Sequence, residues 1–213
     1  MNKILVGIPV IYDANCVRRC LAHIKDADGI LIIDNNATTE IKEIIRPYNK
    51  IVNDKNIYVN PAWNQIMRYF LDHPEFDTVI ILNSDIYLKH DVCTKIRLLD
   101  LDSQKVIPLL TGVKEFTDVQ EATTLVVEDG VAGVFLCLSR KMVEAVYPIP
   151  EEIKLWFGDN WIFKKLRLLD YKMTIYSDLQ AMMDWSRSIG KLPEATTLIE
   201  EDKKAWSLVS KRI

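Results

Sequence analysis

Short apolar runs alternate with helix-forming segments through the first half of the chain. The clearest runs cover residues 4–11, 29–33 and 78–82, and all three are rich in valine and isoleucine. The first two are followed by patterns with apolar residues on one helical face. Strands that are apolar on both faces and separated by helices are typical of a parallel sheet covered on both sides. The sequence therefore predicts an α/β fold with a mostly parallel, Rossmann-type sheet in a single domain.

The remaining segments are assigned more coarsely. Further strands are expected at residues 57–59, 105–110, 131–138, 173–176 and 181–183. Helices are expected at residues 15–24, 38–46, 62–71, 140–146 and 158–169. The domain is expected to span residues 1–190. A charged tail, residues 191–213, follows it and is expected to be helical from Glu200 to Val209.

Length and charge narrow the class of protein. With 213 residues, the chain can bury a large core without disulfides or structural metal. A net charge of −3 disfavours a dedicated nucleic-acid binder, which depends on neutralising phosphates. No signal peptide or membrane span is expected, so the sequence predicts a soluble cytoplasmic protein whose four cysteines are reduced and mostly buried.

Polar residues follow three of the predicted strands. They are Tyr12-Asp13, Asp34-Asn35-Asn36 and Asn83-Ser84-Asp85. In open parallel sheets, ligands bind beyond the carboxyl ends of the strands, so these clusters are expected to converge. Asp85 is the candidate ligand for Mg²⁺ or Mn²⁺, which prefer oxygen ligands and are often shared with substrate phosphates. Each cluster taken alone is equally typical of an ordinary turn.

Two further carboxylates lie in the second half of the chain. Asp159 stands among aromatic residues at a predicted helix start, where it can act as a general base or as the helix N-cap. Asp184 ends an apolar stretch and can bring another oxygen to a cation, or pair with Arg187 in a turn. Arg187 can also bind phosphate oxygens. Neither a phosphate-binding P-loop nor a dinucleotide-binding glycine motif is present.

The order of these segments resembles the GT-A fold glycosyltransferases, and among them the inverting family 2 type. The matching motifs are Ile8 to Asp13, Asp34 to Thr38, Asn60 to Ile66, Asn83-Ser84-Asp85 in place of Asp-x-Asp, Gly130 to Leu138, Gly158-Asp159 with Arg167, and Asp184-Trp185-Ser186. The resemblance covers residues 3 to about 190. It implies a nucleotide-binding half, residues 1–110, and an acceptor and catalytic half, residues 111–190.

The resemblance also implies roles for individual residues. Asp159 is expected to be the general base, and Asp85 and Asp184 to bind Mn²⁺ or Mg²⁺. The donor, a nucleotide sugar and most commonly a UDP-sugar, is expected to contact Pro9, Tyr12, Asp34, Asn64, Asn83, Ser84, Asp85 and Arg187. The reaction implied is hexosyl or pentosyl transfer with inversion, onto a glycan, a lipid-linked sugar or a modified base in DNA.

Three positions depart from the family pattern. Asn83 replaces the first aspartate of Asp-x-Asp, which leaves metal dependence open. Asp159 lacks the preceding glutamate, and Asp184 stands where a histidine is usual. Two other functions therefore stay open: a nucleotidyltransferase, and an inactive module that binds nucleotide sugars.

Overall fold

Strand β1 (Ile4–Val10) lies at the centre of a five-stranded sheet and pairs in parallel with two neighbours. The computed structural model describes residues 2–128, 133–184 and 192–213. The sheet has the order β3-β2-β1-β4-β8, in which only β8 runs antiparallel. Its other strands are β2 (Gly29–Asp34), β3 (Asn49–Val52), β4 (Thr78–Leu82) and β8 (Phe135–Ser139). This confirms the predicted α/β fold with a mostly parallel sheet.

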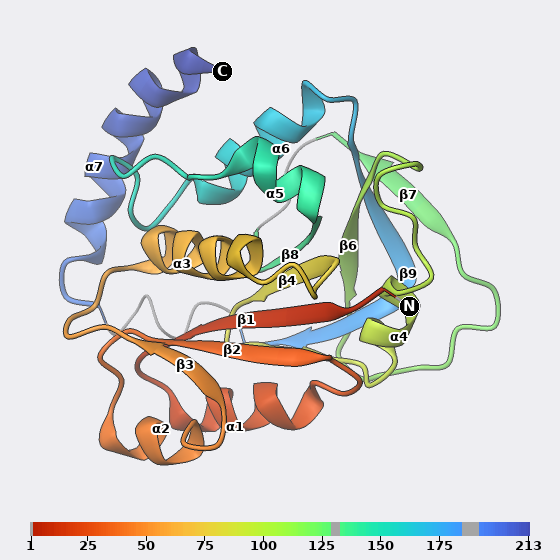
Figure 1. Cartoon of the computed structure of the whole chain (residues 1–213), viewed down its shortest axis with the longest axis horizontal. Coiled ribbons are helices and arrows are strands. Elements are labelled where there is room, and N and C mark those ends of the chain that lie inside the picture. Colours follow the sequence, from red (N-terminus) through yellow and green to blue (C-terminus); the bar gives the residue numbers. More distant parts are fainter. Residues whose placement is uncertain (1, 129–132, 185–191) are drawn as a thin grey trace.

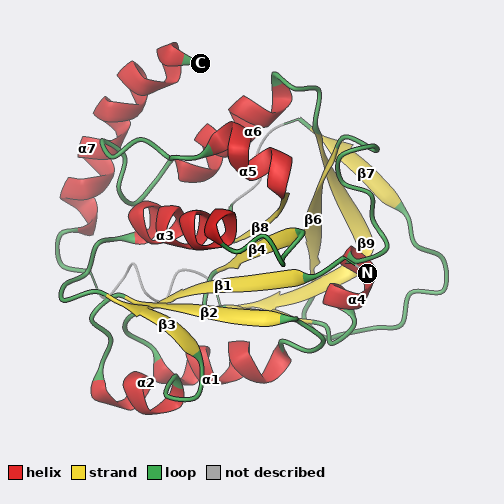
Figure 2. Cartoon of the chain, viewed as in Figure 1, coloured by secondary structure: helices red, strands yellow, loops and turns green. Residues whose placement is uncertain are grey.

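Helices cover both faces of this sheet, as Figures 1 and 2 show. One face carries α1 (Ala14–His23) and α2 (Thr39–Ile44). The other carries α3 (Val59–Asp72), α5 (Arg140–Val146) and α6 (Gly158–Arg167). Helix α7 (Ala195–Val209) and the short 3-10 helix η2 (Ser210–Arg212) come last and run beside the ends of α3 and α6.

A second sheet stands beside the first and is built around the long strand β9 (Lys172–Met183). Strand β9 pairs with β5 (Ile86–Leu88), β6 (Val106–Gly112) and β7 (Thr124–Val127). The short helix α4 (Val92–Ile96) connects β5 toward β6. The strand expected at residues 105–110 therefore exists, but it belongs to this second sheet. Residues 181–183 are the end of β9 and form no separate strand.

The third strand was predicted at the wrong place. Residues 57–59 form no strand, and Val59 begins helix α3. The third strand of the main sheet is β3, whose residues are mostly exposed. An edge strand of this kind carries little apolar signal, whereas three apolar residues before a helix resemble a short strand.

Buried apolar side chains from the sheet and from the helices form one hydrophobic core. All four cysteines are buried, as expected, and they are free thiols. Burial raises the pKa of Cys93 to about 11. Among the described residues, no helix combines the length and apolar character that crossing a membrane requires.

Glycine at position 7 allows α3 to approach the central strand closely. A Cβ added at Gly7 would lie 2.3 Å from Cγ2 of Ile66 on α3. We expect Gly7→Ala to lower the free energy of unfolding by about 1–3 kcal/mol because the helix must shift. Gly112→Ala is the matched control, since its Cβ would meet only the flexible end of Met183, at 3.1 Å. Urea unfolding measures both variants, and equal stabilities would contradict this packing constraint.

Candidate functional site

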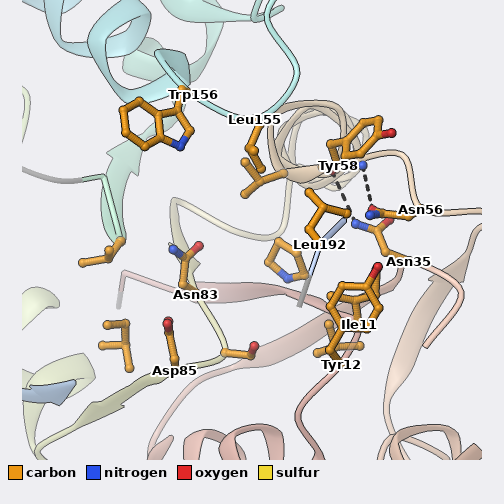
Figure 3. Close-up of a pocket in the computed structure, with 16 residues that line it drawn as sticks. Ile11, Tyr12, Asn35, Asn56, Tyr58, Asn83, Asp85, Leu155, Trp156 and Leu192 are labelled. Atoms are coloured by element: carbon orange, nitrogen blue, oxygen red, sulfur yellow. Dashed lines mark hydrogen bonds between the residues drawn. The ribbon is translucent and has the colours of Figure 1, made fainter. Parts of the chain in front are cut away.

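A cavity of about 290 Å³ opens at the carboxyl ends of the parallel strands. We call it the strand-end cavity. Three strand ends of the main sheet line it: Pro9 to Tyr12 at the end of β1, Asn35 after β2, and Asn83 to Asp85 after β4. This is the position at which open α/β sheets bind ligands. Figure 3 shows Asn83, Asp85 and Tyr12 along one side and Tyr58, Leu155 and Trp156 opposite.

The predicted donor-binding residues divide into several groups. Pro9, Tyr12, Asn83, Ser84 and Asp85 all line the strand-end cavity. Asp34 does not line it; it is buried and its Oδ1 accepts a hydrogen bond from the Ala37 backbone at 2.7 Å. Its neighbour Asn35 faces the cavity in its place. Arg187 lies outside the described residues.

Asn35 belongs to a chain of side-chain amides. Its Oδ1 accepts from Asn53 Nδ2 at 2.9 Å, and Asn53 in turn exchanges hydrogen bonds with Gln65. Nδ2 of Asn35 donates to the Tyr58 carbonyl at 3.4 Å, and the Tyr58 backbone amide donates to Oδ1 of Asn56 at 2.9 Å (Figure 3). These hydrogen bonds hold Asn35 and Tyr58 in place at this end of the cavity.

Asn64 occupies a different place from the other predicted residues. Its Nδ2 donates to the Ile149 carbonyl at 2.8 Å, and its Oδ1 accepts from the Ile149 amide at 2.8 Å. It does not line the strand-end cavity. The side chain thus ties α3 to the segment after α5.

A second cavity, of about 230 Å³, lies beside the first and contains Asp159. We call it the Asp159 cavity. Val59, Asn83, Val134, Leu155 and Trp156 line both cavities, so these residues form a shared wall. A ligand extending from one cavity toward the other would pass along this wall.

Backbone amides on two segments hold the Asp159 carboxylate. Gly133 donates to Oδ2 at 2.8 Å, and Asn160 donates to Oδ1 at 2.8 Å. Asp159 lies in the first turn of α6, and Phe157 rather than Asp159 takes the N-cap position. A Cβ at Gly133 would lie 2.3 Å from Cβ of Asp159, so only glycine permits this approach.

Asp184 is tied to the strand-end cavity through its backbone. Its amide donates to the Asp85 carbonyl at 3.0 Å, next to the pairing of β5 with β9. Its carboxylate accepts from Arg19 at 2.8 Å and from the Tyr87 hydroxyl at 2.7 Å. Burial, followed by hydrogen bonds with Cys16 and Asp184, raises the pKa of Tyr87, so its hydroxyl keeps the proton that it donates.

The described carboxylates meet only part of the requirements of a metal site. No group of three metal-binding side chains occurs in the described part of the chain. Asp85 reaches the strand-end cavity, whereas Oδ2 of Asp184 is engaged by Arg19 and Tyr87. Asp85 also lies close enough to Cys20 that its charge, after burial, contributes to raising the pKa of that thiol. This donor set fits a cation shared with a substrate's phosphates and does not fit a closed protein cage.

Several residues of the site were missed in the sequence. Asn35, Tyr58, Leu155, Trp156 and Leu192 all line the strand-end cavity. Asn35 stood within a recognised motif, and Trp156 stood near Asp159. Leu192 belongs to the C-terminal segment for which the sequence predicts a charged tail, and no local pattern there indicates a place in the cavity.

Comparison with known proteins finds solved structures of similar fold. No protein-family model and no curated protein matches the sequence. The structure is similar to S. aureus TarS, with a TM-score of 0.61, 15% identity, and coverage of 85% of this chain and 36% of TarS. TarS residues 1–349 in complex with UDP give a TM-score of 0.60 and 14% identity, covering 84% of this chain and 60% of that one.

GalNAc-T7, solved with UDP, GalNAc and Mn²⁺, gives a TM-score of 0.64 and 9% identity, covering 85% of this chain and 43% of that one. The chain therefore spans between about a third and three fifths of the length of these proteins. At such low identity the likeness concerns the fold, and it confirms the GT-A glycosyltransferase fold that the motifs indicated.

The variant Asn64→Ala tests whether Asn64 contacts the donor, as the sequence predicts, or stabilises the fold through its hydrogen bonds with Ile149. We expect Asn64→Ala to lower the free energy of unfolding by about 1–3 kcal/mol, because both Ile149 groups lose their partner. Nucleotide affinity of the folded variant should stay unchanged. Arg68→Ala is the control on the same helix, since its exposed ion pair with Asp72 contributes little. Unchanged stability with lost UDP binding, measured by calorimetry, would instead favour a donor contact.

Proposed function

We propose that this protein is a glycosyltransferase that moves a sugar from a nucleotide-sugar donor, most commonly a UDP-sugar, to an acceptor hydroxyl with inversion. The observation that carries the proposal is the pair of adjoining cavities. One contains Asp85 and the three polar strand ends, and the other contains Asp159. The GT-A fold supports this assignment, since two of its similar structures contain UDP.

The nucleotide is placed in the strand-end cavity. Pro9 and Tyr12 provide a surface for the base, and Asn35, next to Asp34, provides amide hydrogen bonds. Asp85, with Asn83 and Ser84, would face the diphosphate end and would hold Mn²⁺ or Mg²⁺ together with the phosphates. When bound, the cation neutralises negative charge on the leaving diphosphate. Asp184, whose Oδ2 accepts hydrogen bonds from Arg19 and Tyr87, would contribute a second carboxylate.

Asp159 is proposed as the general base. It accepts the proton of the acceptor hydroxyl while the acceptor oxygen forms a bond to the anomeric carbon from the face opposite the diphosphate. The bond between that carbon and the diphosphate oxygen breaks, and the configuration inverts. The hydrogen bonds from Gly133 and Asn160 orient the carboxylate for this task.

The role of Asp159 is tested by Asp159→Asn, which keeps the shape of the side chain and removes the base. We expect turnover to fall by about 100-fold or more, with UDP affinity nearly unchanged. Asp170→Asn is the control, because Asp170 is exposed beyond the other end of α6. Release of nucleoside diphosphate measures turnover. Near-normal transfer by Asp159→Asn removes Asp159 from the role.

Donor identity and the metal are tested with a thermal-shift panel of nucleotide sugars, with and without Mn²⁺ or Mg²⁺. A ligand at about 100 times its dissociation constant stabilises the fold by roughly 2.7 kcal/mol. We expect a selective shift with one nucleotide sugar that increases with Mn²⁺, and loss of the Mn²⁺-dependent part in Asp85→Asn. Asp170→Asn again serves as the control. No shift with any nucleotide contradicts the proposed function.

The same preparation separates the competing functions. A transferase releases nucleoside diphosphate when a glycan, lipid-linked sugar or modified DNA base is supplied. A nucleotidyltransferase instead forms or consumes pyrophosphate, and a binding module shifts thermally without releasing product. The acceptor that supports turnover then identifies the class of substrate.

A further inference from the structure

Helix α7 packs against the segment that leads into Asp159. The ring of Trp206 stacks on that of Phe157, with centroids 5.5 Å apart and planes 5° apart. Beyond the helix, Arg212 forms an ion pair with Glu152 at 2.8 Å. The end of the chain is therefore joined to the loop between α5 and α6 at several points.

Asp202 makes the central contact of this interface. Its side chain is almost fully buried, with 1% of its surface exposed. Its carboxylate accepts three backbone hydrogen bonds, from Lys154 at 2.9 Å, Leu155 at 2.7 Å and Trp156 at 2.7 Å. Hydrogen bonds to a charged acceptor are stronger than neutral ones, and they offset the cost of burying the carboxylate. One side chain thus holds three consecutive amides that belong to no helix or strand.

Asn60 of α3 holds the same loop from the other side. Its Nδ2 donates to the Trp156 carbonyl at 2.9 Å and to the Ile153 carbonyl at 3.3 Å. The backbone of Trp156 is consequently bound at its N–H by Asp202 and at its C=O by Asn60. The residue as a whole remains 43% exposed and lines both cavities.

The loop needs such support because its path is unfavourable. Phe157 adopts a left-handed conformation, with φ of 64°, immediately before α6 begins. Non-glycine residues hold this conformation at an energetic cost, so the surrounding contacts must maintain it. Asp159 follows two residues later, and small displacements of the loop would move both the shared wall and the carboxylate.

We infer that Asp202 is a positioning residue, which holds residues 154–156 so that the wall shared by the two cavities and the start of α6 stay in place for the reaction. Its catalytic consequence rests on the proposed function. The inference makes α7 a necessary part of the site, although none of its own residues lines either cavity.

Hydrogen exchange tests the clamp without any reaction. In the wild-type chain we expect the amides of residues 154–156 to be protected, even though they lie in a loop. In Asp202→Asn their exchange should be at least about tenfold faster, because the carboxamide can accept through only one atom. Glu200→Gln, at an exposed position on α7 that pairs with Lys203, should leave the exchange of these amides unchanged. Rapid exchange of these amides in the wild type overturns the inference, even if Asp202→Asn does not fold.

Kinetics test the positioning role, using whichever nucleotide sugar stabilises the wild type and UDP as the binding probe. Well below its unfolding temperature, Asp202→Asn should show kcat reduced about tenfold, while the dissociation constant of UDP changes less than about threefold. A purely stabilising residue would leave kcat of the folded fraction unchanged, and that result overturns the positioning role. If the wild type is protected at residues 154–156 but transfers no sugar, the proposed function fails and the clamp stands.

Discussion

The parallel pairing of β1 with both β2 and β4 governs the rest of this structure. Parallel strands bring all their carboxyl ends to one edge of the sheet, so residues far apart in the chain meet there. Pro9 and Tyr12, Asn35, and Asp85 reach one cavity for this reason alone. The close contact of α3 with β1 at Gly7 covers one face of that sheet.

The second sheet and the loop before α6 position the remaining residues of the candidate site. Strand β9 brings Asp184 beside Asp85 through backbone pairing with β5, while Gly133 places Asp159 next to the shared wall. The two candidate centres, one for a diphosphate and one for proton transfer, thus depend on different layers of the fold. Leu155 and Trp156 lie between them, because both residues line both cavities.

Asp184, a position in the predicted motif, also makes contacts that stabilise the fold. Its carboxylate accepts from Arg19 and Tyr87, and so links α1 to the end of β9. The buried tyrosine retains its proton and fixes the carboxylate's orientation. Under the proposed function, Asp85 would therefore be the main protein ligand of a cation that a substrate's phosphates also bind.

Local patterns in the sequence determined strands β1, β2 and β4, most helices and the polar strand ends, because burial on both faces and helix periodicity leave direct signals in residue order. They missed β3, since an exposed edge strand has no such signal, and they missed the short strands β5 and β7. Only the tertiary structure decided that Asn35 rather than Asp34 faces the cavity, that Asn64 binds Ile149, and that Asp202 holds the loop beside Asp159. These depend on side-chain contacts between residues distant in the chain, which no local pattern encodes.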